Sequence, residues 1–417
     1  MKKHIKLLIL TAIIVALLPL KVGSSREEFD KEASFGEPIV KKDMRGVWVA
    51  TVLNIDYPAK PATDSEILKK EALKILDNVK DLNLNAVFLQ VRPSGDAFYK
   101  SDYYPWSKYL TGEQGLAPEN DFDPLAFWIE EAHKRDIELH AWINPYRVTK
   151  KSFGEPEHNF AALDPANIAV INPSWVVKHS DGNLYLNPGI PQVRNYIIAG
   201  AVEIIKNYNV DGIHMDDYFY PGKEFNDKEE YIKYGNGGFG CIEEWRRECV
   251  NLLVSGLAKA IKENSENVSF GISPFGIWAN EGSHMLGSDT RGAQSYYDHY
   301  ADTRKWVKDE IIDYIAPQIY WHIGFEIADY EKLSKWWADV VKDTNVSLYI
   351  GQAVYRLQYE NPNKPWFGPG EVKKQLEMNK RLPEIKGSIF YNYNSIDKDS
   401  GLFLMLQDYY SRINSVE

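Results

Sequence analysis

Residues 210–221, VDGIHMDDYFYP, carry the clearest chemical signal in the sequence. The stretch begins as an apolar run, yet it contains His214, Asp216 and Asp217 before an aromatic turn that ends in proline. A charged group in a protein core is costly unless it is paired. Two adjacent carboxyl groups in such a place favour general acid–base chemistry, in which one group gives a proton and the other takes a proton or carries negative charge.

Asp216 is our first candidate for an essential carboxylate, because the strand expected here would fix it at the floor of a cleft. Two residues are the main candidates for a second carboxyl group: the adjacent Asp217, and Asp96 in the segment RPSGDAFY. Asp96 has an equally good alternative role, since aspartate in such a segment often caps a turn. Further possibilities are Asp56 and Glu281.

Short β-rich runs alternate with amphipathic segments along the rest of the chain. The β-rich runs lie at 45–52, 85–92, 137–144, 210–216, 268–274, 313–320, 347–353 and 387–393. The helical patterns lie near 65–81, 123–135, 191–207, 241–263, 300–309, 327–342, 370–380 and 401–412. Eight strands that are each followed by a helix predict a (β/α)8 barrel, a TIM barrel, as a single domain over residues 44–417.

The connections between these elements are unequal in length. Those from a helix to the next strand are short, whereas those from a strand to the next helix are long. The long ones are 93–122, 145–190, 217–240, 275–299 and 354–369. Barrels of this kind have their active sites on the face that carries the strand-to-helix loops. The loops are rich in Trp, Tyr, Asn, Asp, Gly and Pro, which suits a cleft that stacks on rings and hydrogen-bonds hydroxyl groups.

Strand periodicity predicts which of these side chains face the barrel interior. Side chains alternate along a strand, so one parity faces the helices and the other faces inward. The apolar Ile213 and Met215 should face the helices, which turns His214 and Asp216 inward. The same test on five strands predicts a group of inward polar residues near the carboxyl ends of the strands. They are Arg92, Asn144, His214, Asp216, Ser273 and Gln318.

Charged and aromatic side chains near the strand ends are candidates for binding a ligand. Arg92 and Arg147 are suited to a carboxylate, which a guanidinium group binds through two parallel hydrogen bonds. Aromatic residues in the same segments either stack on pyranose rings or pack the loops. They are Trp106, Trp278, Tyr320 and Trp321.

A metal-dependent hydrolase or deacetylase is an alternative reading of the same residues. His140 and His214 fall on neighbouring predicted strands and, with Asp216, supply three groups of the kind that bind a metal ion. The sequence lacks the HxH and HExxH spacings that would support this alternative. Our prediction therefore includes no metal or other cofactor. A third possibility is a barrel that binds glycans without cleaving them.

The N-terminus and the net charge bear on location and partners. Residues 1–24 contain basic residues, then an apolar stretch and then small residues, which is the layout of a signal peptide. An uncleaved membrane anchor is the alternative, and residues 25–43 have the composition of a linker. We therefore expect an exported protein of the cell envelope or the extracellular space. The net charge of −11 argues against nucleic acid as a partner, and no obligate protein partner is evident.

Seven segments between residue 44 and about residue 321 resemble, in order, those of the glycosyl hydrolase-like 10 family of bacterial exported proteins. The segments are MRGVWVATVLNIDYP, NAVFLQVRPSGDAFYKSDYYPWS, HAWINPYRV, LNPGIPQVRNYI, VDGIHMDDYFYP, GISPFGIWAN and DYIAPQIYW. The resemblance implies a (β/α)8 barrel that hydrolyses glycosidic bonds. It also implies a role at the bacterial envelope, where some members cut peptidoglycan glycan strands stripped of their peptides. Peptide-free peptidoglycan glycan is therefore the expected polysaccharide substrate.

The first stretch also looks like the fourth strand of glycoside hydrolase family 18, whose pattern is D-G-x-D-x-D-x-E. Asp211, Gly212 and Asp216 match that pattern, but His214 replaces its middle Asp and Tyr218 stands where its acidic Glu would be. Because the proton donor is missing, the mechanism of that family does not transfer directly. We expect two carboxyl groups to act instead, as in most glycoside hydrolysis.

Overall fold

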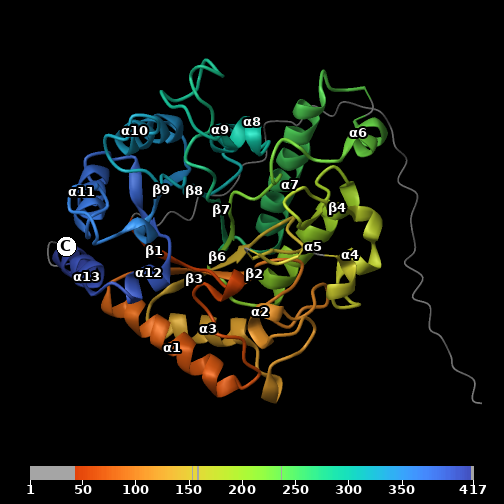
Figure 1. Ribbon diagram of the computed structural model, residues 1–417, viewed down its shortest axis with the longest axis horizontal. Helices are drawn as coiled ribbons and strands as arrows, with labels where there is room; N and C mark the ends of the chain where they lie inside the picture. Colours follow the sequence, from red (N-terminus) through yellow and green to blue (C-terminus); the bar gives the residue numbers. More distant parts are fainter. Residues whose placement is uncertain (1–42, 153, 157–158, 236, 415–417) are drawn as a thin grey trace, which may run out of the picture. The chain divides into compact units, whose positions relative to one another are not determined.

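The computed structural model describes residues 43–414, except 153, 157, 158 and 236. Eight parallel strands close into a barrel in the order β1-β10-β9-β8-β7-β6-β3-β2. Helices surround this barrel in Figure 1. The strands are β1 (Met44–Val49), β2 (Ala86–Arg92), β3 (Glu138–Ile143), β6 (Gly212–Met215), β7 (Ser269–Ile272), β8 (Tyr314–Ile315), β9 (Ser347–Gln352) and β10 (Ile385–Phe390). The predicted (β/α)8 barrel is confirmed.

One helix packs after each barrel strand, as expected. These helices are α1 (Ser65–Asp81), α3 (Pro124–His133), α5 (Pro191–Asn207), α7 (Ile242–Asn264), α9 (Thr303–Lys308), α10 (Tyr330–Val341), α11 (Gly370–Asn379) and α13 (Ser400–Asn414). Further helices lie in the strand-to-helix loops: α2 (Lys108–Thr111), α4 (Ile168–Ile171), α6 (Lys228–Tyr234), α8 (Ser295–Asp298) and α12 (Tyr393–Asp397). Single 3₁₀ turns occupy Val52–Asn54, Glu119–Asp121, Phe160–Ala162, Pro173–Trp175 and Val354–Arg356.

The long loop after β3 contains a small sheet that its sequence did not indicate. Strands β4 (Val176–Lys178) and β5 (Leu184–Leu186) pair antiparallel within this loop. A backbone bridge between Arg147 and Tyr185 joins the start of the loop to β5. The loop is therefore an ordered part of the barrel face at the carboxyl ends of the strands, and it holds the backbone of Arg147 in place.

Helix α1 illustrates how the local sequence forms these elements. The side chain of Asp64 accepts a hydrogen bond from the backbone N–H of Glu66, which satisfies one of the donors that a helix start leaves unpaired. Apolar residues recur every three or four positions, so they form one stripe that faces the core. The buried apolar members are Leu68, Ala72, Ile75, Leu76 and Val79.

Strand residues separate into two groups, as the periodicity predicts. One parity, which includes Val47, Val49 and Leu89, packs with the helices. The other parity fills the barrel interior with its own cluster of buried side chains. Its members are Met44, Trp48, Ala50, Ala86, Phe88, Trp142, Tyr314, Ala316, Tyr349 and Ile389. Because large rings occupy this space, the barrel interior is a packed core rather than a pore.

Arg92 departs from the predicted pattern. The pairing of β2 with β3 shifts register between Gln90 and Arg92, and such a bulge changes which way the following side chain points. The guanidinium of Arg92 lies 4.4 Å from the ring centroid of Tyr104. A Cβ placed on Gly200 of α5 would come within 2.6 Å of its Nη1 atom. Arg92 therefore packs against α5, and the predicted inward orientation was wrong.

Strand β8 is shorter than the predicted run 313–320. Pro317 has no N–H group, so it interrupts the ladder of hydrogen bonds between strands. Beyond it, Gln318 makes isolated bridges to Phe275 and Gly351, which keep the segment in the wall of the barrel.

The sequence-based assignments for the N-terminus fall mostly outside the described residues. The predicted signal peptide, residues 1–24, and the linker as far as residue 42 are not covered. Strand β1 begins at Met44, directly after the residues assigned to the linker. Within the described ranges, every helix is too short or too polar to cross a membrane.

Candidate active site

A cleft opens at the carboxyl ends of the barrel strands. Its cavity volume of about 340 Å³ falls within the range of ligand sites. Asp216 and Asp217 follow β6 directly, so this strand positions both carboxyl groups. The cleft is lined by Trp48, Val52, Leu53, Ile55, Gln90, Trp142, Arg147, Lys150, Asp216, Asp217, Tyr218, Ser273, Phe275, Gln318, Tyr320, Tyr355 and Tyr391.

Asp216 is held by hydrogen bonds on both carboxyl oxygens. Its side chain is 3% exposed. The indole Nε1 of Trp142 donates to Oδ2 at 3.2 Å, and Nδ2 of Asn144 donates to the same oxygen. The backbone N–H of Tyr218 donates to Oδ1 at 3.3 Å. These donors favour the ionised form of Asp216 and fix its orientation at the cleft floor.

Asn144 is itself oriented by a second set of hydrogen bonds. Its Oδ1 atom accepts from Nε2 of Gln90 at 2.5 Å and from Nη2 of Arg147 at 2.8 Å. The Oε1 atom of Gln90 accepts the backbone N–H groups of Thr51 at 3.0 Å and Val52 at 2.9 Å. Because the amide oxygen of Asn144 already has two donors, its amide nitrogen must face the carboxylate.

Asp217 lies in the same cleft and is 6% exposed. Burial, together with the negative charge of Asp216, raises the pKa of Asp217 to about 8. Burial also raises the pKa of Asp216, but Arg147 and the hydrogen bonds above oppose that rise. Arg147 and a hydrogen bond from Gln318 oppose the rise at Asp217 as well, but two close buried carboxyl groups resist double ionisation, so the pair retains a proton near neutral pH. A protonated carboxyl group beside a carboxylate is the acid–base set that glycosidic cleavage needs.

His214 faces the barrel interior as predicted but does not line the cleft. Its Nε2 atom lies 3.1 Å from Nε1 of Trp48 and 2.9 Å from Oγ of Ser273, and its Nδ1 atom lies 3.0 Å from the hydroxyl of Tyr314. Burial lowers the pKa of His214, and the neighbouring His140 adds to the effect. His214 is therefore a neutral group that supports the cleft floor from below.

The same contacts bear on the alternative metal site. Since Trp48 donates to Nε2 of His214, the other ring nitrogen carries the proton, and neither has a lone pair directed at Asp216. The Nδ1 atom of His140 faces the hydroxyl of Tyr314 at 3.2 Å. Among the residues that the structure describes, no group of three or more His, Cys, Asp or Glu side chains is arranged to hold a metal ion. These residues do not form the site that a metal-dependent reaction would use.

Asp96 occupies a separate cavity of about 30 Å³, which it shares with Ser94 and Lys108. Its Oδ2 atom accepts from Nε2 of Gln114 at 3.1 Å, while its Oδ1 atom has no hydrogen-bond partner among the described residues. Burial raises the pKa of Asp96 to about 6. A space of this size holds about one water molecule and excludes a sugar ring. The structure therefore does not bring Asp96 together with the carboxyl pair of the cleft.

The two further carboxyl candidates also lie outside the cleft lining. Asp56 accepts hydrogen bonds from the backbone N–H of Ala50 at 2.8 Å and from Nδ2 of Asn392 at 2.7 Å, and thereby ties the segment after β1 to the end of β10. Glu281 is exposed in the loop after β7. Of the four candidates for the second carboxyl group, only the residue adjacent to Asp216 lies in the cleft.

Three of the predicted binding residues, Arg147, Gln318 and Tyr320, line the cleft. The Nε atom of Arg147 donates to the backbone oxygen of Pro93 at 2.8 Å, and its guanidinium lies 5.3 Å from the ring centroid of Tyr218. The Nε2 atom of Gln318 donates to the backbone oxygen of Ser273 at 2.9 Å. The side chains of Arg147 and Gln318 are thus fixed before any ligand arrives.

Three tyrosines of the cleft lining form an aromatic cluster. The ring centroid of Tyr320 lies 5.8 Å from that of Tyr355 and 6.1 Å from that of Tyr391. Ring faces of this kind bind the apolar faces of sugars. The other aromatic candidates lie outside the cleft lining and pack against the core, so their expected stacking on a sugar has no support. They are Trp106, Trp278 and Trp321.

Several cleft residues were missed by sequence reasoning. Trp48 and Trp142 come from β1 and β3, where parity gives a direction but not a depth along the barrel. Tyr355 and Tyr391 follow β9 and β10, and an inspection of all eight predicted strand ends would have identified them. Lys150 lies in the loop after β3, and no signal in the sequence marks it.

Comparison with known proteins agrees with the fold. Residues 43–368 match the family model described as Glycosyl hydrolase-like 10. Glycosyl hydrolase YngK of Bacillus subtilis (strain 168) is 45% identical over 363 residues, which cover 86% of this chain and 69% of that protein. Glycosyl hydrolase DigH of Escherichia coli (strain K12) is 41% identical over 372 residues, which cover 85% of this chain and 84% of that protein.

Solved structures with a similar fold include glycoside hydrolase barrels. The glycoside hydrolase domain of PgaB (BpsB) from Bordetella bronchiseptica superimposes with a TM-score of 0.55 at 13% identity, covering 88% of this chain and 98% of that one. The endo-β-1,4-mannanase of Thermotoga petrophila gives 0.53 at 10% identity, covering 90% and 77%. At such identities these two structures support the fold alone. The family match, together with relatives more than 40% identical, shows that this chain belongs to the Glycosyl hydrolase-like 10 family and is a glycoside hydrolase.

Proposed function

We propose that this chain is an exported glycoside hydrolase that cleaves peptide-free glycan strands of peptidoglycan, with Asp217 as the proton donor and Asp216 as the carboxylate. One observation carries the catalytic part: the two buried carboxyl groups share the cleft but have different surroundings. Burial and the charge of Asp216 raise the pKa of Asp217 to about 8. Arg147 and three hydrogen-bond donors favour the ionised form of Asp216.

In the proposed reaction, the carboxyl group of Asp217 protonates the glycosidic oxygen while the bond to the anomeric carbon breaks. The carboxylate of Asp216 stabilises the positive charge that develops on the sugar ring or activates the attacking water. That water gives its hydroxyl group to the anomeric carbon, and its remaining proton restores the acid. Asn144 and Trp142 keep the Asp216 oxygen in place throughout, so little reorganisation is needed during the reaction.

The substrate part of the proposal has three supports of unequal strength. The family resemblance implies peptidoglycan glycan, and the signal-like residues 1–24 would bring the enzyme to the cell wall. The cleft combines hydrogen-bonding and aromatic groups with two cations, Arg147 and Lys150. This combination suits a strand that carries hydroxyl and acetamide groups as well as the lactyl carboxylate of muramic acid. The names of these relatives specify glycosyl hydrolysis and no substrate.

The function is tested by incubating the purified protein with intact peptidoglycan, amidase-stripped glycan strands, chitin and xylan. Mass spectrometry then identifies the products. We expect the stripped strands to be cut fastest and the products to have new reducing ends. Equal or faster cleavage of chitin or xylan would contradict the substrate proposal. Saturable binding of every glycan without cleavage would instead support a barrel that only binds.

Export rests on residues 1–24 and has its own test. We expect the protein expressed in a bacterial host to appear in the envelope or medium fraction with its N-terminus after Ser24, as determined by mass spectrometry. Retention of the first residues in a membrane fraction would support the uncleaved anchor. Accumulation in the cytosol with an intact N-terminus would contradict export.

A further inference from the structure

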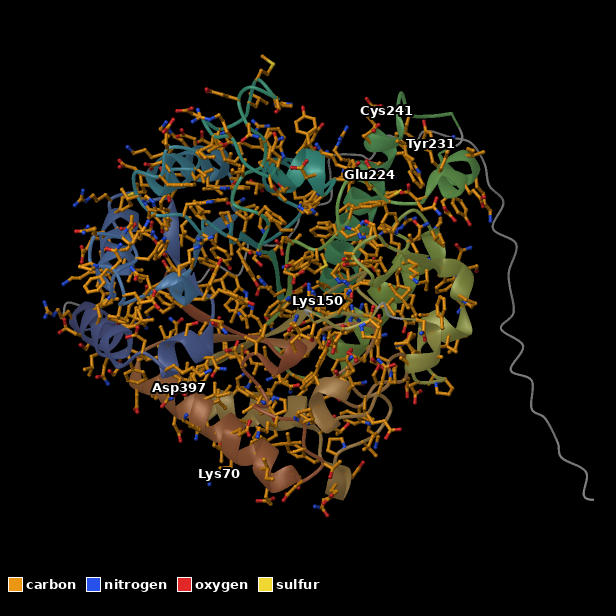
Figure 2. The ribbon with its side chains drawn as sticks, viewed as in Figure 1. Lys70, Lys150, Glu224, Tyr231, Cys241 and Asp397 are labelled. Carbon is orange, nitrogen blue, oxygen red and sulfur yellow. The ribbon has the colours of Figure 1, made fainter. Side chains whose placement is uncertain are left out.

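Lys150 stands out among the residues that line the cleft. It lies in the loop after β3, near Arg147, and shares the cleft with both catalytic carboxyl groups. Figure 2 shows Lys150 near the centre of the view, inside the ring of helices, whereas Lys70 of α1 lies at the rim. The side chain is partly buried and lines both the cleft and the small cavity that holds Asp96.

The ammonium group of Lys150 has no hydrogen bond or ion pair with any residue that the structure describes. The carboxylate that attracts it electrostatically is Asp181. This carboxylate is already engaged, because it accepts from the hydroxyl of Tyr185 at 2.7 Å and from the backbone N–H of Asn183 at 2.9 Å. Burial and the positive charge of Arg147 lower the pKa of Lys150, which indicates a cation short of counter-charge.

Arg147 differs from Lys150 in this respect. Its Nε atom donates to the backbone oxygen of Pro93 and its Nη2 atom to Oδ1 of Asn144, so the guanidinium is used to position the network around Asp216. The three donors of the Lys150 ammonium group are left for a ligand. A neutral sugar hydroxyl would leave that positive charge uncompensated, whereas a carboxylate would both neutralise it and accept its hydrogen bonds.

We propose that Lys150 is a specificity-determining residue that binds a carboxylate carried by the glycan beside the scissile bond. On the substrate of the proposed function, on which this inference rests, that group is the lactyl ether carboxylate of muramic acid. A uronic acid offers the same chemistry from a different polymer. Arg92, the residue that sequence reasoning paired with Arg147 for this task, packs against α5 instead.

The test compares Lys150→Met and Lys150→Arg with the wild type on stripped glycan strands and on the same strands with the lactyl carboxyl reduced to an alcohol. For Lys150→Met on native strands we expect KM to rise about tenfold or more, because a hydrogen bond to a charged group is lost. We expect kcat to stay within about twofold, since this binding is the same in the ground state and the transition state. The wild type should cleave carboxyl-reduced strands with a higher KM than native strands. For Lys150→Met, the KM for reduced strands should equal that of the wild type. Lys150→Arg should restore most of the wild type's preference for native over reduced strands.

Lys108→Met is the matched control. Lys108 is exposed and lines the small Asp96 cavity but not the cleft, so its replacement should leave KM unchanged. A wild type that cuts native and reduced strands equally well would overturn the role of Lys150 while leaving the proposed function intact. An equal loss of kcat/KM on native and reduced strands in Lys150→Met would also overturn that role, because it would indicate that Lys150 acts structurally. Cleavage of a uronic acid polymer but not of stripped strands, with the same dependence on Lys150, would overturn the proposed substrate and support the carboxylate site.

Discussion

The cleft and the small cavity of Asp96 both bury aspartate side chains whose pKa is raised, and of these two sites only the cleft has the form of an active site. The cleft holds Asp216 and Asp217 in about 340 Å³, with aromatic and cationic groups around them. The other cavity holds Asp96 in about 30 Å³. Burial raises the pKa in both places, so a perturbed carboxyl group alone does not identify catalysis. Space for a sugar ring and a second carboxyl group distinguish the cleft.

The largest expected effect comes from removing the acidic groups of the cleft. Asp217→Asn and Asp216→Asn should each lower kcat on stripped glycan strands by about 10²–10⁴-fold, because general acid–base catalysis contributes that much. The measurement is the initial rate of reducing-end formation. Circular dichroism and the melting temperature should show that each variant is folded.

Asp96→Asn is the counterpart in the small cavity. Its activity should stay within about threefold of the wild type, since the cavity admits only water. A folded Asp96→Asn variant with a hundredfold loss would break the comparison and return Asp96 to the catalytic set. Near wild-type activity of Asp217→Asn would show that Asp217 is not the proton donor.

The stability of Asp96→Asn should depend on pH differently from that of the wild type. The pKa of Asp96 is raised to about 6 in the folded protein, above the ordinary value of 3.8 for an aspartate, so the folded state binds this proton more tightly than the unfolded state. The contribution of Asp96 to the free energy of unfolding therefore falls as pH rises from about 4 to about 6. Relative to wild type, the variant should gain about 2–3 kcal/mol between pH 4 and pH 7 in urea unfolding. A constant difference across this range would contradict the proposed origin of the shift.

The pH dependence of kcat/KM should report the pair in the cleft. The proton donor is active while it is protonated, and the pKa of Asp217 is raised to about 8. We therefore expect kcat/KM to fall about tenfold per pH unit above that value. Asp216 must be ionised, so kcat/KM should also fall as pH drops through its pKa. If kcat/KM of Asp217→Asn still falls above pH 8 as it does in the wild type, the fall is due to the titration of another group.

The smallest expected effect separates aromatic residues inside the cleft from those outside it. Tyr355 is 45% exposed on the cleft wall, so Tyr355→Ala should raise KM severalfold with little change in melting temperature. Trp321 packs against the core outside the cleft lining, so Trp321→Ala should lower the free energy of unfolding by roughly 1–3 kcal/mol with KM unchanged. The reverse pattern would place the sugar site on the Trp321 side.

The alternation of β-rich runs and helical patterns was enough to predict the barrel and the face that carries the cleft. Strand parity correctly turned His214 and Asp216 inward, because the period of two is a local property of an extended chain. The adjacency of Asp217 to Asp216 is written in the sequence as well. These features depend on residues close together in the chain, so their pattern is visible before folding.

Only the tertiary structure decided the rest, because the remaining features depend on contacts between distant segments. A bulge in the pairing of β2 with β3 turned Arg92 toward α5, and no local pattern marks such a shift. Along β6, His214 lies deeper in the barrel, below the cleft floor, whereas Asp216 lies at the cleft floor. The separation of Asp96 into its own cavity and the place of Lys150 in the cleft lining arise from how the long loops pack. The sequence by itself determined which chemical groups the barrel end would carry, and the packing of loops and strands selected which of them a substrate can reach.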